Sequence, residues 1–151
     1  MRTKNILLVS LLAVLGLVFQ SCDDKNDEKN IQFADLPSVS KTLVNTHFAD
    51  KKVASVMKDN EFMDKSYTVF FTDGTKVEFE KNGEWDSLES PEGVPSSIIP
   101  SKIRAYVTEN YPDEKVITIE RDQSDKEIEV ELSNRFDLIF DATTHELKKM
   151  D

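Results

Sequence analysis

The chain contains an internal repeat, and this repeat restricts the possible folds more than any other feature of the sequence. Residues 36–59 align without gaps to residues 99–122, at an offset of 63 positions. An offset of 61 then aligns the segments that begin at Tyr67 and Ile128. The same order of patterns therefore occurs twice, which predicts two tandem copies of one supersecondary unit.

Each copy begins with a helical pattern. Apolar residues recur at spacings of three and four within residues 36–48 and again within residues 99–111, which predicts one amphipathic helix per copy. Pro37 and Pro100 stand at the start of these segments. A proline is tolerated there because the first N–H groups of a helix have no partner within the helix. Pro112 follows the second segment and ends it.

Each copy continues with strand patterns. Apolar and polar residues alternate with period two in residues 67–72, 76–80, 127–132 and 136–141. Asp73-Gly74 predicts a tight hairpin turn between the first two of these strands. Clean alternation indicates a sheet with one buried and one solvated face. The expected fold class is therefore α+β: two tandem helix-plus-antiparallel-strand repeats that form a two-layer domain with the helices on one sheet face.

The repeats define the expected domain organisation. Repeat 1 covers about residues 36–88 and repeat 2 about residues 99–151, and the Pro-, Gly- and Ser-rich segment between them reads as a loop. A single repeat with one helix would bury too little apolar surface to be stable alone. We therefore expect the two repeats to form one folding unit over residues 36–151.

The N-terminus has the pattern of a secretion signal. Arg2 and Lys4 precede an uncharged apolar run at residues 6–19, which is shorter than the roughly 20 residues of a membrane span. Ser21-Cys22 follows this run and resembles the lipobox of bacterial lipoproteins, and Cys22 is the only cysteine. The resemblance implies a lipoprotein signal peptide at residues 1–21 and a lipid on Cys22. An ordinary secretory signal cut nearby, or an uncleaved anchor, is the alternative.

Charge limits the possible partners. Residues 22–35 read as an acidic flexible tether. Removal of residues 1–21 takes away two basic residues and no acid, which leaves 17 basic and 29 acidic side chains and a net charge of −12. Such a chain is a poor match for nucleic acid or for anionic lipid. The expected membrane attachment is therefore the lipid on Cys22.

Structural motifs of the folded part resemble those of the PepSY-like lipoproteins of the Bacteroidetes. The residues that carry the resemblance are Leu36-Pro37, Phe48, Asp73-Gly74, Val77-Glu78-Phe79, Asn82-Gly83-Glu84-Trp85, Val94-Pro95, Ile99-Pro100, Tyr106-Val107 and Tyr111-Pro112. One departure is Asn134-Arg135, at the position of Asp73-Gly74 in the first repeat. The resemblance implies an arrangement similar to the beta-lactamase inhibitor protein, whose concave sheet face grips an enzyme.

The sequence contains no recognisable catalytic or metal-binding motif. His47 and His145 are the only histidines and lie in different predicted elements, whereas a zinc site needs three or four ligands at coherent spacing. No serine stands in a Gly-x-Ser-x-Gly elbow. We therefore expect a protein that is not an enzyme and that uses no cofactor and no metal.

The predicted binding site is the open face of the sheet. Phe70 and Ile139 fall on the polar side of their strands, and acidic residues surround them. The candidate partner-binding residues are Phe70, Glu78, Glu129, Glu131 and Ile139. An ordinary solvated sheet face is the alternative interpretation.

The expected function is that of an exported, lipid-anchored binding module of the bacterial envelope, at the outer membrane and facing the periplasm or the cell surface. It would bind a protein or peptide, and it could inhibit or regulate an envelope enzyme. The alternative is a structural or scaffold subunit of an envelope complex, without an inhibitory role.

Overall fold

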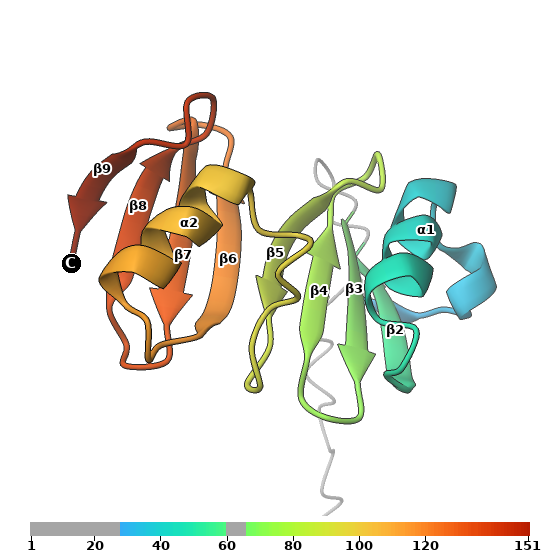
Figure 1. Cartoon of the computed structure of the whole chain (residues 1–151). Helices are drawn as coiled ribbons and strands as arrows, with labels where there is room; N and C mark the ends of the chain where they lie inside the picture. The colour runs from blue at the N-terminus through green and yellow to red at the C-terminus, as the bar shows by residue number, and fades with distance from the viewer. Residues whose placement is uncertain (1–27, 60–65) are drawn as a thin grey trace, which may run out of the picture.

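The computed structural model of the chain describes residues 28–59 and 66–151 (Figure 1). The predicted signal peptide at residues 1–21, the candidate lipid site Cys22 and the first part of the predicted tether lie outside the described residues. In the two described segments, no helix is long and apolar enough to cross a membrane.

A single antiparallel sheet of nine strands dominates the described chain, and its strands are ordered in space as they are in sequence. The strands are β1 (Lys29–Asn30), β2 (Val53–Asp59), β3 (Ser66–Phe71), β4 (Lys76–Phe79), β5 (Trp85–Glu89), β6 (Val116–Asp122), β7 (Glu127–Leu132), β8 (Asp137–Asp141) and β9 (Leu147–Met150). Each strand pairs with its neighbours in the sequence, so the sheet is a meander with β1 and β9 at its edges.

Two helices lie on one side of this sheet, α1 (Ser38–His47) in the first repeat and α2 (Ser101–Asn110) in the second (Figure 1). A 3-10 turn, η1 (Phe33–Asp35), precedes α1. The two helices predicted from apolar spacing are confirmed. Pro37 and Pro100 are their N-cap residues.

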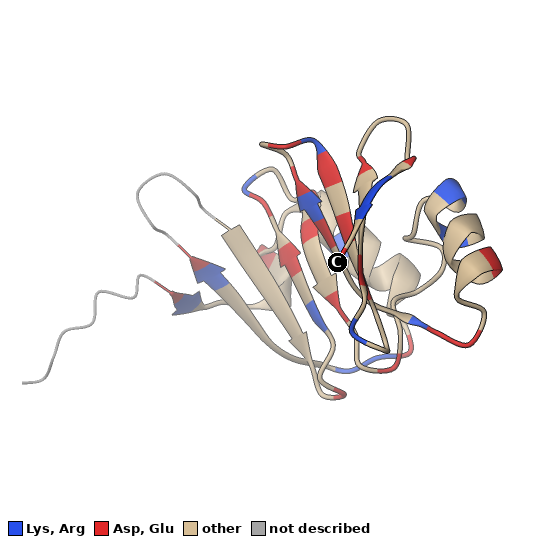
Figure 2. Ribbon diagram, turned by 90° about the vertical axis from the view of Figure 1, so that its left-hand side faces the viewer, with Lys and Arg blue, Asp and Glu red and all other residues tan. Residues whose placement is uncertain are grey.

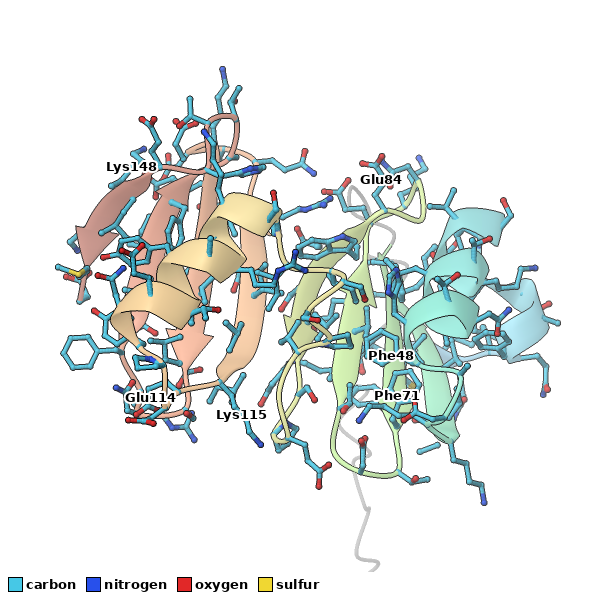
Figure 3. All side chains as sticks on the ribbon, viewed as in Figure 1. Phe48, Phe71, Glu84, Glu114, Lys115 and Lys148 are labelled. Atoms are coloured by element: carbon cyan, nitrogen blue, oxygen red, sulfur yellow. The ribbon has the colours of Figure 1, made fainter. Side chains whose placement is uncertain are left out.

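The core fills the space between the helices and the sheet. Under α1, the rings of Phe48 and Phe71 lie side by side with centroids 5.2 Å apart (Figure 3). Under α2, Tyr106 meets Phe140 edge to face at 5.6 Å. The buried apolar residues of the strands are Val56, Val69, Phe71, Val77, Phe79, Trp85, Leu88, Val116, Ile119, Ile128, Val130, Leu132, Leu138 and Phe140. In the described part of the chain, both helices lie on this one side, and no helix covers the other face of the sheet.

The pairing of β5 with β6 joins the two repeats into one sheet. Only three residue pairs form this seam, with Leu88 opposite Ile119 at its centre, and both of these side chains are fully buried. Beside them the guanidinium of Arg121 lies 3.7 Å from the ring centre of Trp85, a cation–π contact between the repeats. The seam is therefore short but well packed.

The expected fold class, a two-layer α+β domain of two tandem helix-plus-antiparallel-strand repeats, is wrong. The described chain is mostly one open nine-stranded antiparallel sheet, and its two α-helices have only ten residues each. The sequence reading missed the strands β1, β2, β5, β6 and β9. The strand β1 has only two residues. Register shifts interrupt the pairing of the other four. A bulge adds one residue and reverses the alternation, so the period of two disappears from the sequence.

Candidate functional site

All five residues predicted for the binding site lie on the open face of the sheet. Register places Glu78, Ser87, Glu120, Glu129 and Ile139 opposite one another on consecutive strands from β4 to β8. We call this set the acidic row. It runs across the strands, and neighbouring strands lie about 4.8 Å apart, so Glu78 and Glu129 are separated by about 14 Å.

The other two predicted residues belong to a parallel row on the same face. Phe70 pairs with Lys76 on β4, and Glu131 on β7 pairs with Thr118 and Asp137. The structure thus brings the five side chains to one face. Phe70 and Glu131 stand at opposite sides of the seam and are four strand spacings apart, about 19 Å. Whether these residues bind a partner stays a prediction.

Two carboxylates at the centre of the acidic row face each other without a compensating cation. Glu120 on β6 is directly opposite Glu129 on β7, and both are exposed. Among the described residues, neither has an ion-pair partner. Like charges directly opposite each other on one sheet face are destabilising.

The nearby negative charges change the pKa of Glu129. Partial burial raises the pKa of Glu129, and the negative charges of Asp137 and Glu120 raise it further. The pKa of Asp86, at the bulge of β5, is raised in the same way by burial and by Glu80 and Glu120. The face therefore holds negative charge that its own residues do not neutralise.

Two of the predicted acidic residues are already engaged. Glu131 accepts a hydrogen bond from Arg135 Nη1 at 2.6 Å and one from Thr118 Oγ1 at 3.1 Å, and these contacts lower the pKa of Glu131. Lys76 Nζ lies 3.3 Å from Glu78 Oε1. Both contribute less free negative charge to the face than Glu120 and Glu129 do.

The open face also carries two apolar side chains. The ring of Phe70 is 37% exposed, and Ile139 is half-buried between Glu129 and Lys149. An exposed aromatic ring beside a charged row offers a partner both apolar and electrostatic contacts. Asp and Glu recur along the strands of the sheet, as Figure 2 shows.

Glu120 and Asp86 are the site residues that sequence reasoning missed. Glu120 alternates with the buried Ile119, which is a visible signal, but only the strand register shows that it faces Glu129. Asp86 is concealed because it occupies the bulge between Trp85 and Ser87. The sequence contained no signal for its position.

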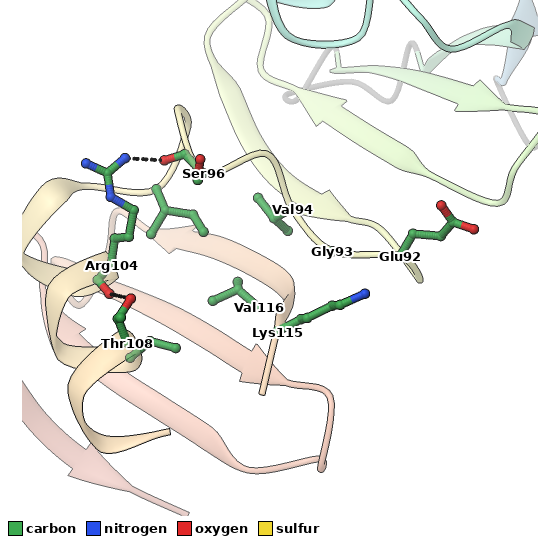
Figure 4. A pocket seen from close by; sticks show the side chains of 10 residues that line it. Glu92, Gly93, Val94, Ser96, Arg104, Thr108, Lys115 and Val116 are labelled. Carbon is green, nitrogen blue, oxygen red and sulfur yellow. Dashed lines mark hydrogen bonds between the residues drawn. The ribbon is translucent and has the colours of Figure 1, made fainter. Parts of the chain in front are cut away.

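A pocket of about 260 Å³ lies away from this face, where the segment between the repeats crosses α2 and β6 (Figure 4). Arg104 Nη1 donates to the carbonyl of Ser96 at 2.9 Å, and Val94 N–H donates to the carbonyl of Val116 at 2.8 Å. These contacts hold the connecting segment in place. No group of three or more His, Cys, Asp or Glu side chains in the described part of the chain is arranged to hold a metal ion.

Comparison with known proteins identifies the family. A family model described as beta-lactamase-inhibitor-like and PepSY-like matches residues 65–147, which is more than half of the chain. No curated protein matches the chain.

Three solved structures from Bacteroides resemble the chain over nearly their whole length. A protein of Bacteroides thetaiotaomicron, described as a candidate calcium-regulated periplasmic protein, is 45% identical with a TM-score of 0.79, covering 83% of this chain and 97% of its own. A periplasmic protein of Bacteroides vulgatus is 40% identical with a TM-score of 0.77, covering 84% and 98%. A second one, described as of unknown function, is 30% identical with a TM-score of 0.75, covering 82% and 98%.

These solved chains are thus almost completely covered by their alignments with this chain. Their descriptions as periplasmic proteins support export of this chain. The predicted resemblance is confirmed by both comparisons: the chain belongs to the PepSY-like family.

Proposed function

We propose that this protein is an envelope binding module, without catalytic activity, whose open sheet face binds a protein or peptide with a Lys- or Arg-rich surface. The proposal rests on the pair Glu120 and Glu129, which has no ion-pair partner among the described residues. The pair lies on a sheet face that no helix of those residues covers. Their repulsion costs stability in the free protein. A basic partner would relieve it.

Charge complementarity selects the occupant. The chain without residues 1–21 has a net charge of −12, and the acidic row concentrates part of that charge on the sheet face that also carries the exposed ring of Phe70. Complementary charge speeds association and suppresses wrong partners. An apolar or acidic partner would gain nothing from Glu120 and Glu129.

Inhibition or regulation of an envelope enzyme is the proposed consequence of this binding. The family model's own description, beta-lactamase-inhibitor-like, supports an inhibitory role. We further propose that the module is held at the outer membrane by a lipid on Cys22, on the pattern of residues 1–22.

Calcium is not part of the proposal, although one solved relative is described as a candidate calcium-regulated protein. The acidic row is linear and crosses several strands. A calcium site instead surrounds the ion with six to eight oxygen ligands. The described residues contain no such group.

The test compares three immobilised forms of residues 23–151: the wild type, the double variant Glu120→Gln/Glu129→Gln, and a control with equal charge change, Glu109→Gln/Asp113→Asn. Glu109 and Asp113 are exposed at the end of α2 and beyond it. Envelope proteins retained on each column are identified by mass spectrometry. The matched control separates the effect of the open face from that of net charge.

We expect one basic protein to be retained by the wild type and the control and to be lost from the open-face variant. The purified partner should be released by salt and displaced by a decalysine peptide. Equal retention on all three columns would reject the open face as the site. A stoichiometric complex of structural envelope proteins on all three columns would favour the scaffold function instead.

A further inference from the structure

A pocket of about 440 Å³ lies at one end of the second repeat and uses no residue of the acidic row. The start of α2, the turn between β6 and β7, and the turn between β8 and β9 bound this pocket. These three segments lie together at the upper end of the second repeat in Figure 1. The volume of the pocket is in the range of small-molecule sites. Three basic side chains line it: Arg121, Lys126 and His145.

The two repeats differ at this place. In the first repeat the corresponding turn contains Gly83, whose φ is +89°, and it packs tightly on the start of α1. A Cβ atom on Gly83 would lie 2.6 Å from Pro37 Cβ, and Ser40 Oγ donates to the carbonyl of Gly83 at 2.9 Å. In the second repeat the equivalent left-handed position is His145, with a φ of +57°. Lys102, near the start of α2, donates to the carbonyl of Thr144 in this turn at 3.0 Å, and the pocket lies beside this contact.

Two side chains of the pocket stand on backbone that favours glycine. Lys126 and His145 have φ values of +55° and +57°, in the left-handed region. Residues other than glycine are uncommon there because of a steric penalty. The first repeat uses glycine at the position equivalent to His145. The fold therefore gains nothing from an imidazole at this position.

Two of the basic side chains, Lys126 and His145, are free to meet a ligand, whereas the acidic side chains of the lining accept hydrogen bonds or form an ion pair. Asp122 accepts hydrogen bonds from Ser124 Oγ at 2.6 Å and from the N–H of Asp125 at 3.0 Å. Glu127 is paired with Lys148 at 2.5 Å. In the described segments, no hydrogen bond or ion pair involves the side chain of Lys126 or His145.

The ring of Trp85 covers the flat face of the Arg121 guanidinium at 3.7 Å, and Arg121 Nη1 lies 3.5 Å from the carbonyl of Trp85. The donors of a guanidinium lie in its plane, where they can grip a carboxylate. Glu80, Glu84 and Asp86 also act on Arg121 and offset part of its charge. Lys126 and His145 are therefore needed to complete an anion site.

We propose that this pocket binds a small organic carboxylate. The carboxylate group is held by Lys126, His145 and the edge of Arg121. The apolar part of the ligand lies against Pro100, Ile128 and Ala142, which complete the lining. This assignment is independent of the proposed function of the open face.

The test uses the only tryptophan of the chain, Trp85, as a reporter, because it stacks on Arg121. Cyclohexanecarboxylate is titrated into residues 23–151, with neutral cyclohexanemethanol and inorganic phosphate as comparison probes. We expect a saturable change in fluorescence with the carboxylate alone. An equal response to the alcohol or to phosphate would overturn the assignment, and so would the absence of a saturable response to the carboxylate.

Two variants locate the site. His145→Gly should raise the melting temperature, since glycine relieves the left-handed backbone, and should weaken carboxylate binding about tenfold or more. Lys126→Ala should weaken binding to a similar extent. Lys81→Ala, in the corresponding turn of the first repeat, is the matched control and should bind normally, as should Glu120→Gln/Glu129→Gln. Unchanged affinity in His145→Gly and Lys126→Ala would refute the proposal.

Discussion

At the scale of single residues, the open face keeps charges that weaken the fold. Glu120 and Glu129 face each other across β6 and β7, and burial together with neighbouring acids raises the pKa of Glu129 above its ordinary value of 4.5. The folded chain thus binds this proton more tightly than the unfolded chain does. The contribution of Glu129 to the free energy of unfolding therefore falls as the pH rises through its raised, folded-state pKa. At neutral pH this contribution is unfavourable.

Glu129→Gln should accordingly stabilise the protein at pH 7. We expect a gain in the free energy of unfolding of about 0.2–1 kcal/mol, the usual size of a cross-strand charge effect. At about pH 4, where Glu129 is largely protonated, the difference from the wild type should shrink. Urea unfolding at both pH values measures it. A gain of the same size at both would show that repulsion is not the cause.

At the scale of elements, the sequence predicted the helices and the hairpins that keep a regular period, and it failed where bulges change the period. Val69 and Phe71 alternate cleanly, so β3 was visible. In β5 the buried residues Trp85 and Leu88 are three positions apart, because the strand contains a bulge. The alternation of β7 also placed Glu129 on the open face. The sequence could not show that Glu120 lies opposite Glu129, because this register depends on the pairing of two separate strands.

The seam between β5 and β6 provides a test at this scale. Leu88→Ala removes a fully buried side chain opposite Ile119, and we expect it to cost about 2–5 kcal/mol. Because the seam has only three residue pairs, amide hydrogen exchange should rise first in β5 and β6. Leu88→Met, which conserves volume, is the control and should cost less than about 1.5 kcal/mol. Uniformly faster exchange across the sheet would instead mean that the seam has no separate weakness.

At the scale of the whole molecule, the chain combines a signal-like start with one open sheet over the described residues. The net charge of −12 after removal of residues 1–21 disfavours adhesion to anionic lipid. A protein of this kind would stay at a membrane only through a covalent anchor or a bound partner.

Cys22→Ala in the full chain should therefore release the protein from the membrane fraction of the producing cell. It should also abolish incorporation of an alkyne-labelled palmitate, which the wild type would take up on the lipidated cysteine. Cell fractionation and in-gel fluorescence measure the two effects. Ser21→Thr, a conservative change beside Cys22, is a control for expression. Labelling that persists in Cys22→Ala would place the lipid elsewhere or show that there is another anchor.

The meander order of the sheet also bears on how the protein is assembled after export. Every strand pairs with the strand that precedes it in the chain, so no pairing has to wait for a distant segment. Folds with such local contacts form quickly, since little loop-closure entropy opposes them. A chain that passes through a secretion pore from its N-terminus can therefore add strands one at a time as they emerge, and each half-finished sheet exposes only one growing edge.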